Sequence, residues 1–359
     1  MKKTKDTVTG QLVTAEKQNL VACLATLGIN GLAHSIPMDS NAKFVAAGTT
    51  PSPRTIEAEV QDWLDVIHAQ TSFWGQSLNV LHRGTFCGVE NIWGFAFDKT
   101  TPIGTAASAA SDGDSTWCGR YYNYLYNIVG NRVINGDIFA PIPEGTTHAF
   151  DGNFFVSSQN NYHTLFSEFR TITNTYAAAK GVSVVFMSHN NFSELYSGWL
   201  FGSMFTDQGF AGADYYGQVQ GTLYNRVEDY ITDWLAIHNG GHGNAAGKPL
   251  FWGEWGDISG NAMPSADAAT IEKRLAWLIR YYKAVRDNLV DPGKMVGYNY
   301  WGGWEGQNTS LLYKTGSGAS SQYFLNARGK ILAAFLKSQA GISRVPVITA
   351  GSGADSYTF

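Results

Sequence analysis

The sequence predicts a single (β/α)8 barrel, and three observations lead to this fold class. Short apolar segments alternate with amphipathic helices along the chain, which is typical of parallel βα units. The length of 359 residues is one that an α/β barrel uses as a single domain. An open doubly wound sheet is the alternative, but no predicted strand is followed by the glycine-rich phosphate loop that such sheets commonly carry.

The helices are predicted from apolar residues that recur with helical spacing. In the first helix, over residues 14–27, Leu20, Val21, Leu24 and Leu27 share one face. The same pattern predicts further helices over residues 54–69, 117–129, 162–180, 221–238, 268–290 and 322–337.

The strands are predicted from short apolar segments between these helices. They lie at residues 29–36, 77–82, 133–142, 182–187, 209–217, 248–253 and 295–301. These segments leave one barrel position open. We expect the eighth strand either in residues 7–13 or outside this sequence.

Two further segments bear on domain organisation. We expect residues 1–340 to form the barrel domain and residues 341–359, which turn small and polar, to form a linker or extended tail. Such a tail hints at a further module in the natural polypeptide.

The loop over residues 100–115, rich in Gly, Ala, Ser and Thr, is long enough to be functional, and we expect it at the rim of a site.

The composition is poor in charge and rich in aromatic rings. Charged residues make up 15% of the chain and aromatic residues 14%, with a net charge of -4. Nucleic acid is not expected as a partner, because phosphate binding needs concentrated positive charge. The rings suit either a large core or a surface that stacks on uncharged, hydroxylated ligands such as sugars.

The sequence predicts neither a membrane segment nor a cysteine-based framework. No apolar run is long enough for a transmembrane helix, and the apolar residues 19–28 follow a polar stretch that is unlike the start of a signal peptide. Cys23, Cys87 and Cys118 fit no disulfide framework or metal-ligand spacing. Free buried thiols are predicted, with a pair between Cys87 and Cys118 as the alternative. No metal or cofactor is expected.

Residues with chemical function gather at the predicted strand ends. Barrel enzymes carry their reacting groups at the C-terminal ends of strands, so these positions define the candidates. In chain order they are His34, His82, Arg83, Glu144, His189, Asp214, Tyr215, Tyr216, Glu254 and Trp301. Any one of these residues fits an ordinary loop, but the whole set favours a site at the barrel mouth.

Two carboxylates stand out. Glu254 ends an apolar strand between Trp252 and Trp255, where partial desolvation would control its ionisation. Glu144 ends another strand, while its competitor Asp137 lies near the start of that strand. Two carboxyl groups about 5 to 5.5 Å apart suit a retaining glycosidase, in which one is the nucleophile and the other is the acid and then the base.

The order of strand ends resembles the clan A glycoside hydrolases, the (β/α)8 group that includes family 5 cellulases and mannanases. Glu144 matches the acid/base at the end of strand four, and Tyr216 the tyrosine of strand six. Glu254, within Trp-Gly-Glu-Trp-Gly, matches the nucleophile of strand seven. Trp301 matches the sugar-platform tryptophan of strand eight, and His82 resembles the histidine of strand three. The likeness covers most of residues 15–338.

The resemblance implies an enzyme that hydrolyses β-glycosidic bonds of a neutral polysaccharide by double displacement. Its nucleophile would be Glu254 and its acid/base Glu144, with Tyr216, Arg83 and His82 orienting the nucleophile. Substrate-binding residues would be His34, His189, Trp252, Trp255, Trp301 and Trp304, although at least one of the tryptophans is expected in the core. Such an enzyme is expected outside the cell or at its surface, as a monomer or as part of a multidomain chain.

Two departures from the family pattern keep alternatives open. Pro143 stands where the family has an Asn before the acid, so Glu194 is the reserve acid. The strand-two arginine is replaced by His34, and Arg83 would reach the nucleophile from the next strand instead. A non-catalytic sugar-binding barrel within a larger surface or phage-tail protein is therefore the second hypothesis for the function. A barrel enzyme of other chemistry, such as a lyase, is the third hypothesis.

Overall fold

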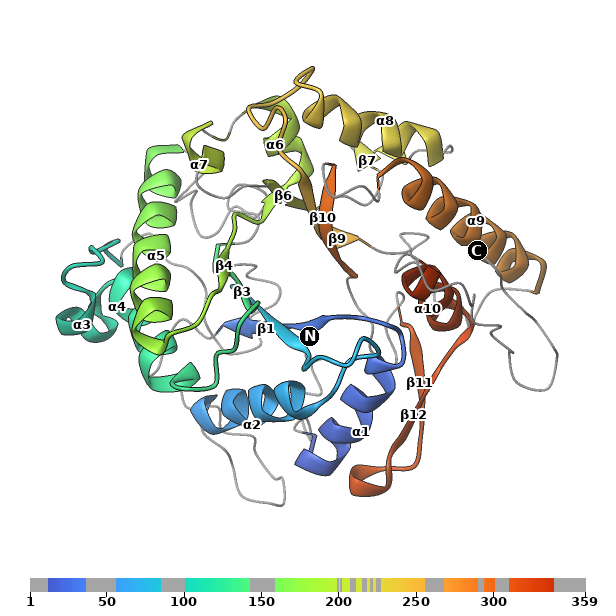
Figure 1. The fold of residues 1–359 in the computed structure, drawn as a ribbon, viewed down its shortest axis with the longest axis horizontal. Coiled ribbons are helices and arrows are strands. Elements are labelled where there is room, and N and C mark those ends of the chain that lie inside the picture. Colours follow the sequence, from blue (N-terminus) through green and yellow to red (C-terminus); the bar gives the residue numbers. More distant parts are fainter. Residues whose placement is uncertain are drawn as a thin grey trace.

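A computed structural model gives the fold of the chain. It describes residues 12–36, 56–84, 101–142, 159–198, 200, 202–206, 211–214, 218–219, 222–223, 227–255, 268–289, 294–300 and 310–338. Strands form an inner ring, and helices surround it (Figure 1). The architecture is the predicted (β/α)8 barrel.

Parallel strands form the inner ring as two sheets of four. The first sheet runs in the order β1 (Gly31–Ile36), β2 (Asn79–Gly84), β3 (Ile138–Ala140) and β4 (Val185–Phe186). The second sheet runs in the order β10 (Met295–Tyr300), β9 (Leu250–Trp255), β6 (Ala211–Asp214) and β5 (Asn190–Asn191). Only residues 187–189 separate β4 from β5, so these two short strands together take one barrel position. Most of the expected eighth strand lies outside the described residues, and Leu12 and Val13 are not in a strand.

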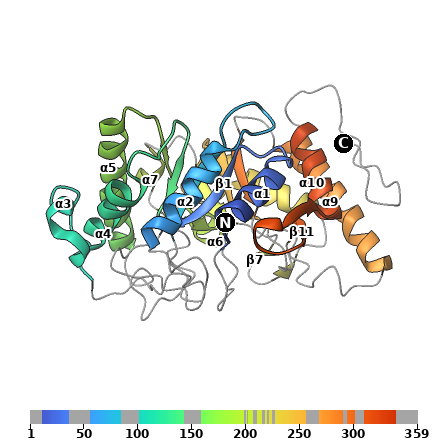
Figure 2. The same ribbon diagram turned by 90° about the horizontal axis from the view of Figure 1, so that it is seen from below.

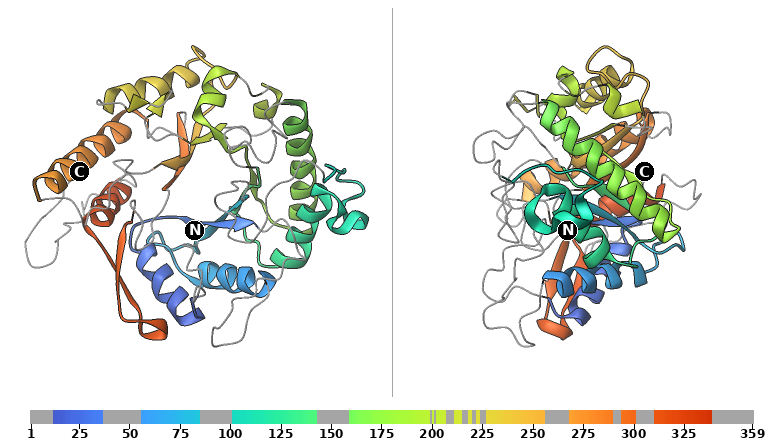
Figure 3. Two further views of the ribbon diagram at one scale, coloured as in Figure 1. Left: turned by 180° about the vertical axis from the view of Figure 1, so that it is seen from behind. Right: turned by 90° about the vertical axis from the view of Figure 1, so that its left-hand side faces the viewer.

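Helices cover the outer face of the strands, as the views in Figure 3 also show. The longer ones are α1 (Thr14–Ala25), α2 (Ile56–Ala69), α5 (Gln159–Lys180), α8 (Val227–His238), α9 (Ala268–Asn288) and α10 (Ala327–Ser338). Shorter helices are α3 (Ala109–Asp112), α4 (Trp117–Asn123), α6 (Phe192–Ser197) and α7 (Ser203–Thr206). In α2, for example, the predicted stripe of Val60, Leu64 and Ile67 is fully buried, which is the reason this segment folds as an amphipathic helix.

The two faces of the strands bury different side chains. A small cluster of Leu81, Ala140, Met187 and Phe251, with Ala33 and Ile138 beside it, fills the barrel interior. The alternate residues, such as Val80 and Phe139, join the large cluster between strands and helices. A Cβ at Gly297 would lie 2.8 Å from the Phe251 ring, so glycine at this position of β10 leaves the interior space to that ring.

Two predicted helices begin later than expected. Residues 322–325 form β12 (Gln322–Leu325), which pairs with β11 (Leu312–Thr315) as an antiparallel hairpin next to α1. Residues 222–223 form β8 (Thr222–Leu223), paired with β7 (Gln218–Val219). In both cases the aromatic or β-branched residues at the start of the segment favour strand, and helical spacing holds only from Ala327 and Val227 onwards.

The loop over residues 100–115 does not lie at the barrel rim. Its residues 106–115 include α3 and a short turn of 3-10 helix, and the backbone N–H of Ala106 donates to Glu168 of α5 over 2.6 Å. Figure 2 shows α3 at the outer edge of the molecule. The expectation of a rim loop is therefore wrong, because these residues pack on the outer side of the helical layer.

Two of the three cysteines lie in the described part of the chain. Cys23 and Cys118 are free thiols, and burial raises the pKa of Cys23 to about 11 and that of Cys118 to about 12. Cys87 and the expected tail of residues 341–359 lie outside the described residues. None of the described helices combines the length and the hydropathy of a membrane span.

Candidate active site

Arg83 and His189 meet at the C-terminal ends of their strands inside the barrel. Arg83 follows Leu81 on the inner face of β2, and its Nε donates a hydrogen bond to Nδ1 of His189 over 3.3 Å. His189 lies between β4 and β5, two residues after Met187 of the interior cluster, and is fully buried. Because a guanidinium only donates, Nδ1 of His189 must be an unprotonated acceptor and the imidazole must be neutral.

His189 is therefore placed to hold Arg83 rather than to touch a ligand. Its side chain has no exposed surface, which does not fit the predicted contact with substrate. Arg83 is partly exposed, as an orienting residue at a site requires. The sequence predicted both residues at the mouth, and the structure joins them there as a pair.

Register places Asp214 and Glu254 side by side at the same end of the barrel. Asn191 of β5 pairs with Asp214 of β6, and Asp214 pairs with Glu254 of β9. The three backbone positions form a row across neighbouring parallel strands, at the edge where barrel enzymes hold their reacting groups.

A bulge at Gly253 brings position 254 into that row. Ala213 pairs with Trp252, but the next residue, Asp214, pairs with Glu254, so Gly253 is an extra residue in β9. A shift of one residue exchanges the faces of a strand. The register thus gives position 254 the inner face, and Trp252 the outer face.

Trp252 belongs to the core, so its predicted role in sugar binding is wrong. Its side chain is only 1% exposed. The ring packs between helices α8 and α9, with centroid distances of 5.0 Å to Trp234 and 6.0 Å to Tyr281. Alternation along β9 explains the position, because Phe251 takes the inner face and Trp252 the outer one.

Asn299 is a residue that the sequence did not single out. It lies on β10 beside the bulge, and its side-chain amide donates to the carbonyl of Gly253 over 3.0 Å. Two signals were present in the sequence: a glycine inside a strand often marks a bulge, and asparagine is uncommon within strands.

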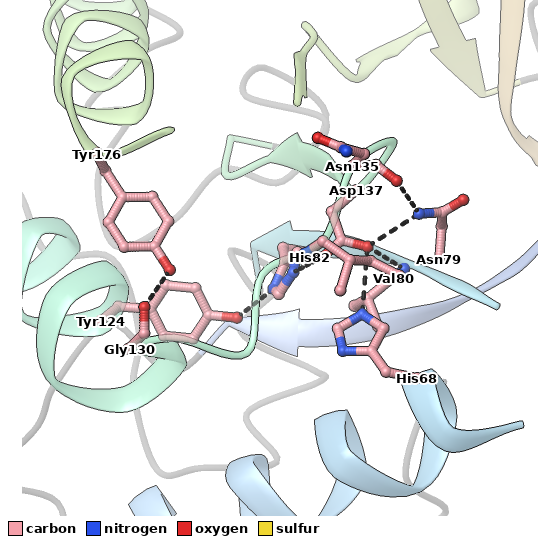
Figure 4. Close-up of polar contacts among 10 residues, drawn as sticks. His68, Asn79, Val80, His82, Tyr124, Gly130, Asn135, Asp137 and Tyr176 are labelled. Carbon is pink, nitrogen blue, oxygen red and sulfur yellow. Dashed lines mark hydrogen bonds and ion pairs between the residues drawn. The ribbon is translucent and has the colours of Figure 1, made fainter. Parts of the chain in front are cut away.

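His82 points away from the barrel interior into a buried network, which Figure 4 shows. Its Nδ1 lies 2.6 Å from the Tyr124 hydroxyl, and its Nε2 lies 3.8 Å from Oδ2 of Asp137. Its ring stacks on the outward Phe139 at 4.3 Å. The prediction that His82 orients the nucleophile is therefore wrong, since its neighbour Arg83 takes the inner face instead.

Asp137 is the centre of this outer network, and its carboxylate is completely buried. Oδ1 accepts from the backbone N–H of Val80 at 2.8 Å and lies 3.3 Å from Nε2 of His68. Oδ2 accepts from the backbone N–H of Ile134 at 3.0 Å. Asp137 thus joins the starts of β2 and β3 to α2, far along each strand from the mouth, which fits its predicted place near the strand start.

Burial and hydrogen bonding act in opposite directions on Asp137. Burial alone would raise the pKa of its carboxyl group, but the hydrogen bond with His68 and the nearby imidazole of His82 outweigh it and hold the pKa below its usual range. Burial lowers the pKa of His82, with Asp137 opposing this only in part. The network therefore contains a carboxylate beside a His82 that burial keeps neutral, with Nδ1 of His82 hydrogen-bonded to the Tyr124 hydroxyl.

His34 shares the outer face with His82, its register partner. It is 4% exposed, and burial holds the pKa of its imidazole well below the usual value, with Lys17 of α1 adding to the effect. Its predicted role in substrate binding is therefore wrong. Strand alternation again decides the outcome, because Ala33 occupies the inner face.

Glu194, the reserve acid, also lies outside the barrel interior. It belongs to the first turn of α6, is 6% exposed, and is close enough to Tyr162 of α5 to raise the pKa of that phenol, after the larger effect of burial. The Tyr162 hydroxyl donates to Asn190 over 2.6 Å. The carboxyl group of Glu194 thus sits in the layer between strands and helices.

Several predicted site residues lie outside the described part of the chain. These are Glu144, Tyr216, Trp301 and Trp304, and the residues Pro143 and Tyr215 beside them. For Glu254 and Trp255 the structure describes the backbone alone. Within the described ranges, no group of three or more His, Cys, Asp or Glu side chains is arranged to hold a metal ion.

Comparisons with known proteins give a fold but no close relative. No protein family model and no curated protein matches the sequence. The β-glycosidase BGL167 matches in structure with a TM-score of 0.54 at 12% identity, over 92% of this chain and 88% of that one. A β-glycosidase from Pyrococcus horikoshii matches with a TM-score of 0.51 at 12% identity, over 90% of this chain and 84% of that one.

A GH5_18 protein from Bifidobacterium longum, solved with Manβ1-4GlcNAc, matches with a TM-score of 0.52 at 10% identity, over 93% of this chain and 75% of that one. These identities are too low to carry function across. The structural matches confirm the predicted fold class. The chain has the (β/α)8 barrel fold that these glycoside hydrolases share.

Proposed function

We propose that this protein is a retaining glycoside hydrolase that cleaves β-glycosidic bonds within a neutral polysaccharide such as cellulose or mannan. Glu254 is the nucleophile and Glu144 the acid/base. The observation that carries the proposal is the bulge at Gly253, which puts position 254 beside Asp214 at the C-terminal ends of the strands. A strand without this bulge would give position 254 the outer face, where Trp252 packs against the helices.

The proposed reaction needs only the two carboxyl groups and water. Glu254 attacks the anomeric carbon as a carboxylate while Glu144 gives its proton to the leaving oxygen, which breaks the glycosidic bond and forms a glycosyl-enzyme. Glu144, now a carboxylate, then takes a proton from water, and the hydroxide attacks the same carbon and releases Glu254. Two displacements retain the β configuration.

Other residues of the mouth position these groups and the sugar. Arg83, whose Nε is fixed on His189, presents positive charge that orients the nucleophile, and Tyr216 donates a hydrogen bond to it. Trp255, Trp301 and Trp304 supply ring faces for pyranose C–H groups. An extended polysaccharide substrate places the enzyme outside the cell or at its surface.

The test is hydrolysis of a panel of β-glucans, mannans and aryl β-glycosides by the purified protein. Glu254→Gln should lower kcat at least 1,000-fold, about 4 kcal/mol, while sugar binding is retained. With an aryl glycoside and azide, Glu254→Ala should form the α-glycosyl azide and Glu144→Ala the β-glycosyl azide, which assigns the two roles. Full activity of Glu254→Gln would refute the assignment.

A non-catalytic sugar-binding barrel is the second candidate. It is favoured by the outward positions of His34 and His82, which remove two polar groups from the predicted site, and by Pro143 before the proposed acid. The same panel separates the two candidates. Binding to a glycan without hydrolysis of any substrate by the unaltered protein would establish the binder.

A further inference from the structure

The bulge in β9 is visible from both of its neighbouring strands. On the β6 side, Gly253 is left over between the pairs Ala213–Trp252 and Asp214–Glu254. On the β10 side, Tyr298 pairs with Trp252 and Tyr300 with Trp255, so that two residues of β9 lie opposite Asn299 alone. Two residues against one is the defining pattern of a bulge.

Alternation along β10 puts Asn299 on the inner face. Gly297, two residues earlier, lies against the ring of Phe251 in the barrel interior. Tyr300, the next residue, packs against the outer core instead. Asn299 thus shares the barrel interior with the position that the bulge gives to Glu254, and it is partly buried there.

The side chain of Asn299 bonds to the extra residue itself. Its Nδ2 donates to the carbonyl of Gly253 over 3.0 Å. A bulge disrupts the ladder locally, and a backbone carbonyl there needs another donor. Glycine at the extra position adds no side chain that would compete for the space in front of position 254.

We propose that Asn299 is a positioning residue: its amide holds the Gly253 carbonyl, fixes the bulge, and so keeps Glu254 on the inner face at the barrel mouth. The catalytic part of this inference rests on the proposed function, whereas the structural part does not. Without the amide, β9 is free to pair without the extra residue, and a one-residue slip would exchange the face of position 254.

The experiment compares three variants. Asn299→Ala removes the amide, and Asn299→Asp keeps the shape but, when ionised, has no hydrogen to donate. Asn288→Ala is the matched control, because Asn288 of α9 also donates from Nδ2 to a backbone carbonyl, that of Ala284, over 2.9 Å but on an exposed helix. Kinetics on the best substrate and a crystal structure are measured for each.

Both Asn299 variants should lower kcat at least ten-fold with KM within about two-fold, since misplacing a reacting group costs turnover rather than binding. Asn288→Ala should match the unaltered protein. In the crystal structure of Asn299→Ala, Glu254 should no longer pair with Asp214, or β9 should occupy two alternative registers of which only one keeps this pair. Unchanged kcat together with unchanged pairing would overturn the inference.

Failure of the proposed function gives a different pattern. If Glu254→Gln is fully active, the catalytic part of the inference falls with the nucleophile assignment, and the crystal structure of Asn299→Ala still decides whether the amide fixes the bulge. If Glu254→Gln is inactive and Asn299→Ala is fully active, the nucleophile stands and Asn299 does not position it.

Discussion

His82 and Arg83 are neighbours in β2, yet they belong to two unlike regions of the molecule. His82 lies on the outer face, completely buried in the network of Asp137, Tyr124 and His68. Arg83 lies on the inner face, partly exposed and bonded to His189. A polar residue at a strand end is therefore part of the buried structure on the outer face of the barrel, and on the inner face it belongs to the proposed site.

The largest expected effect is a loss of stability when the buried network of the outer face is broken. Asp137→Ala should lower the free energy of unfolding by about 3 to 5 kcal/mol, because it leaves two buried backbone N–H groups and the His68 imidazole without their acceptor. Urea denaturation measures the loss. The activity of each folded molecule should stay near that of the unaltered protein, since the network lies away from the mouth.

Asp65→Ala is the matched control for this change. Asp65 is 58% exposed and pairs with Arg132 at 2.7 Å, so its loss should cost under about 1 kcal/mol. Equal losses for the two variants would show that the buried network contributes no more than a surface ion pair.

The next largest effect is a loss of activity when Arg83 of the inner face is replaced. Arg83→Gln should lower kcat/KM about 100-fold, or about 2.7 kcal/mol, because the proposed nucleophile loses the charge that orients it. Denaturation should change little, since Arg83 is partly exposed. Arg132→Gln, a change of the same type at a surface ion pair, is the control, and a similar loss of activity there would contradict a special role for Arg83.

Two changes of His189 test whether its hydrogen bond positions Arg83. His189→Leu removes the acceptor for Arg83 Nε and should lower kcat/KM about ten-fold, or about 1.4 kcal/mol. His189→Asn keeps an acceptor oxygen near the place of Nδ1 and should restore most of that loss. Steady-state kinetics of the two variants decide the matter, and equal activity would mean that the bond does not position Arg83.

The last effect concerns the pH dependence of the outer region, which is gradual and is measured per pH unit. Burial lowers the pKa of His34 and of His82 below the ordinary value of 6.5. Below pH 6.5 the unfolded chain therefore binds protons that the folded chain does not. Stability should fall from pH 6.5 towards pH 5 by up to about 1.4 kcal/mol per pH unit for each histidine.

Urea denaturation between pH 7.5 and 5 measures this dependence. His34→Leu should reduce its slope, because one of the two histidines no longer takes up a proton on unfolding. An unchanged slope in that variant would mean that His34 does not contribute.

Sequence reasoning reached the fold class because helical and strand periodicities are local properties of the chain. It also placed Arg83, His189 and Glu254 at strand ends. It failed for His34, His82 and Trp252 because the face of a strand residue depends on where the strand starts and on bulges, and both are set by neighbouring strands. The pairs Arg83–His189 and Asn299–Gly253 join strands far apart in the chain, so no local pattern predicts them.

The distance between the carboxyl groups of Glu144 and Glu254 tests the central claim most directly. A crystal structure with a bound oligosaccharide would measure it. The proposed double displacement predicts about 5 to 5.5 Å, with both groups facing the sugar from inside the barrel. A separation above about 10 Å, or a Glu254 side chain on the outer face with Trp252, would contradict the account.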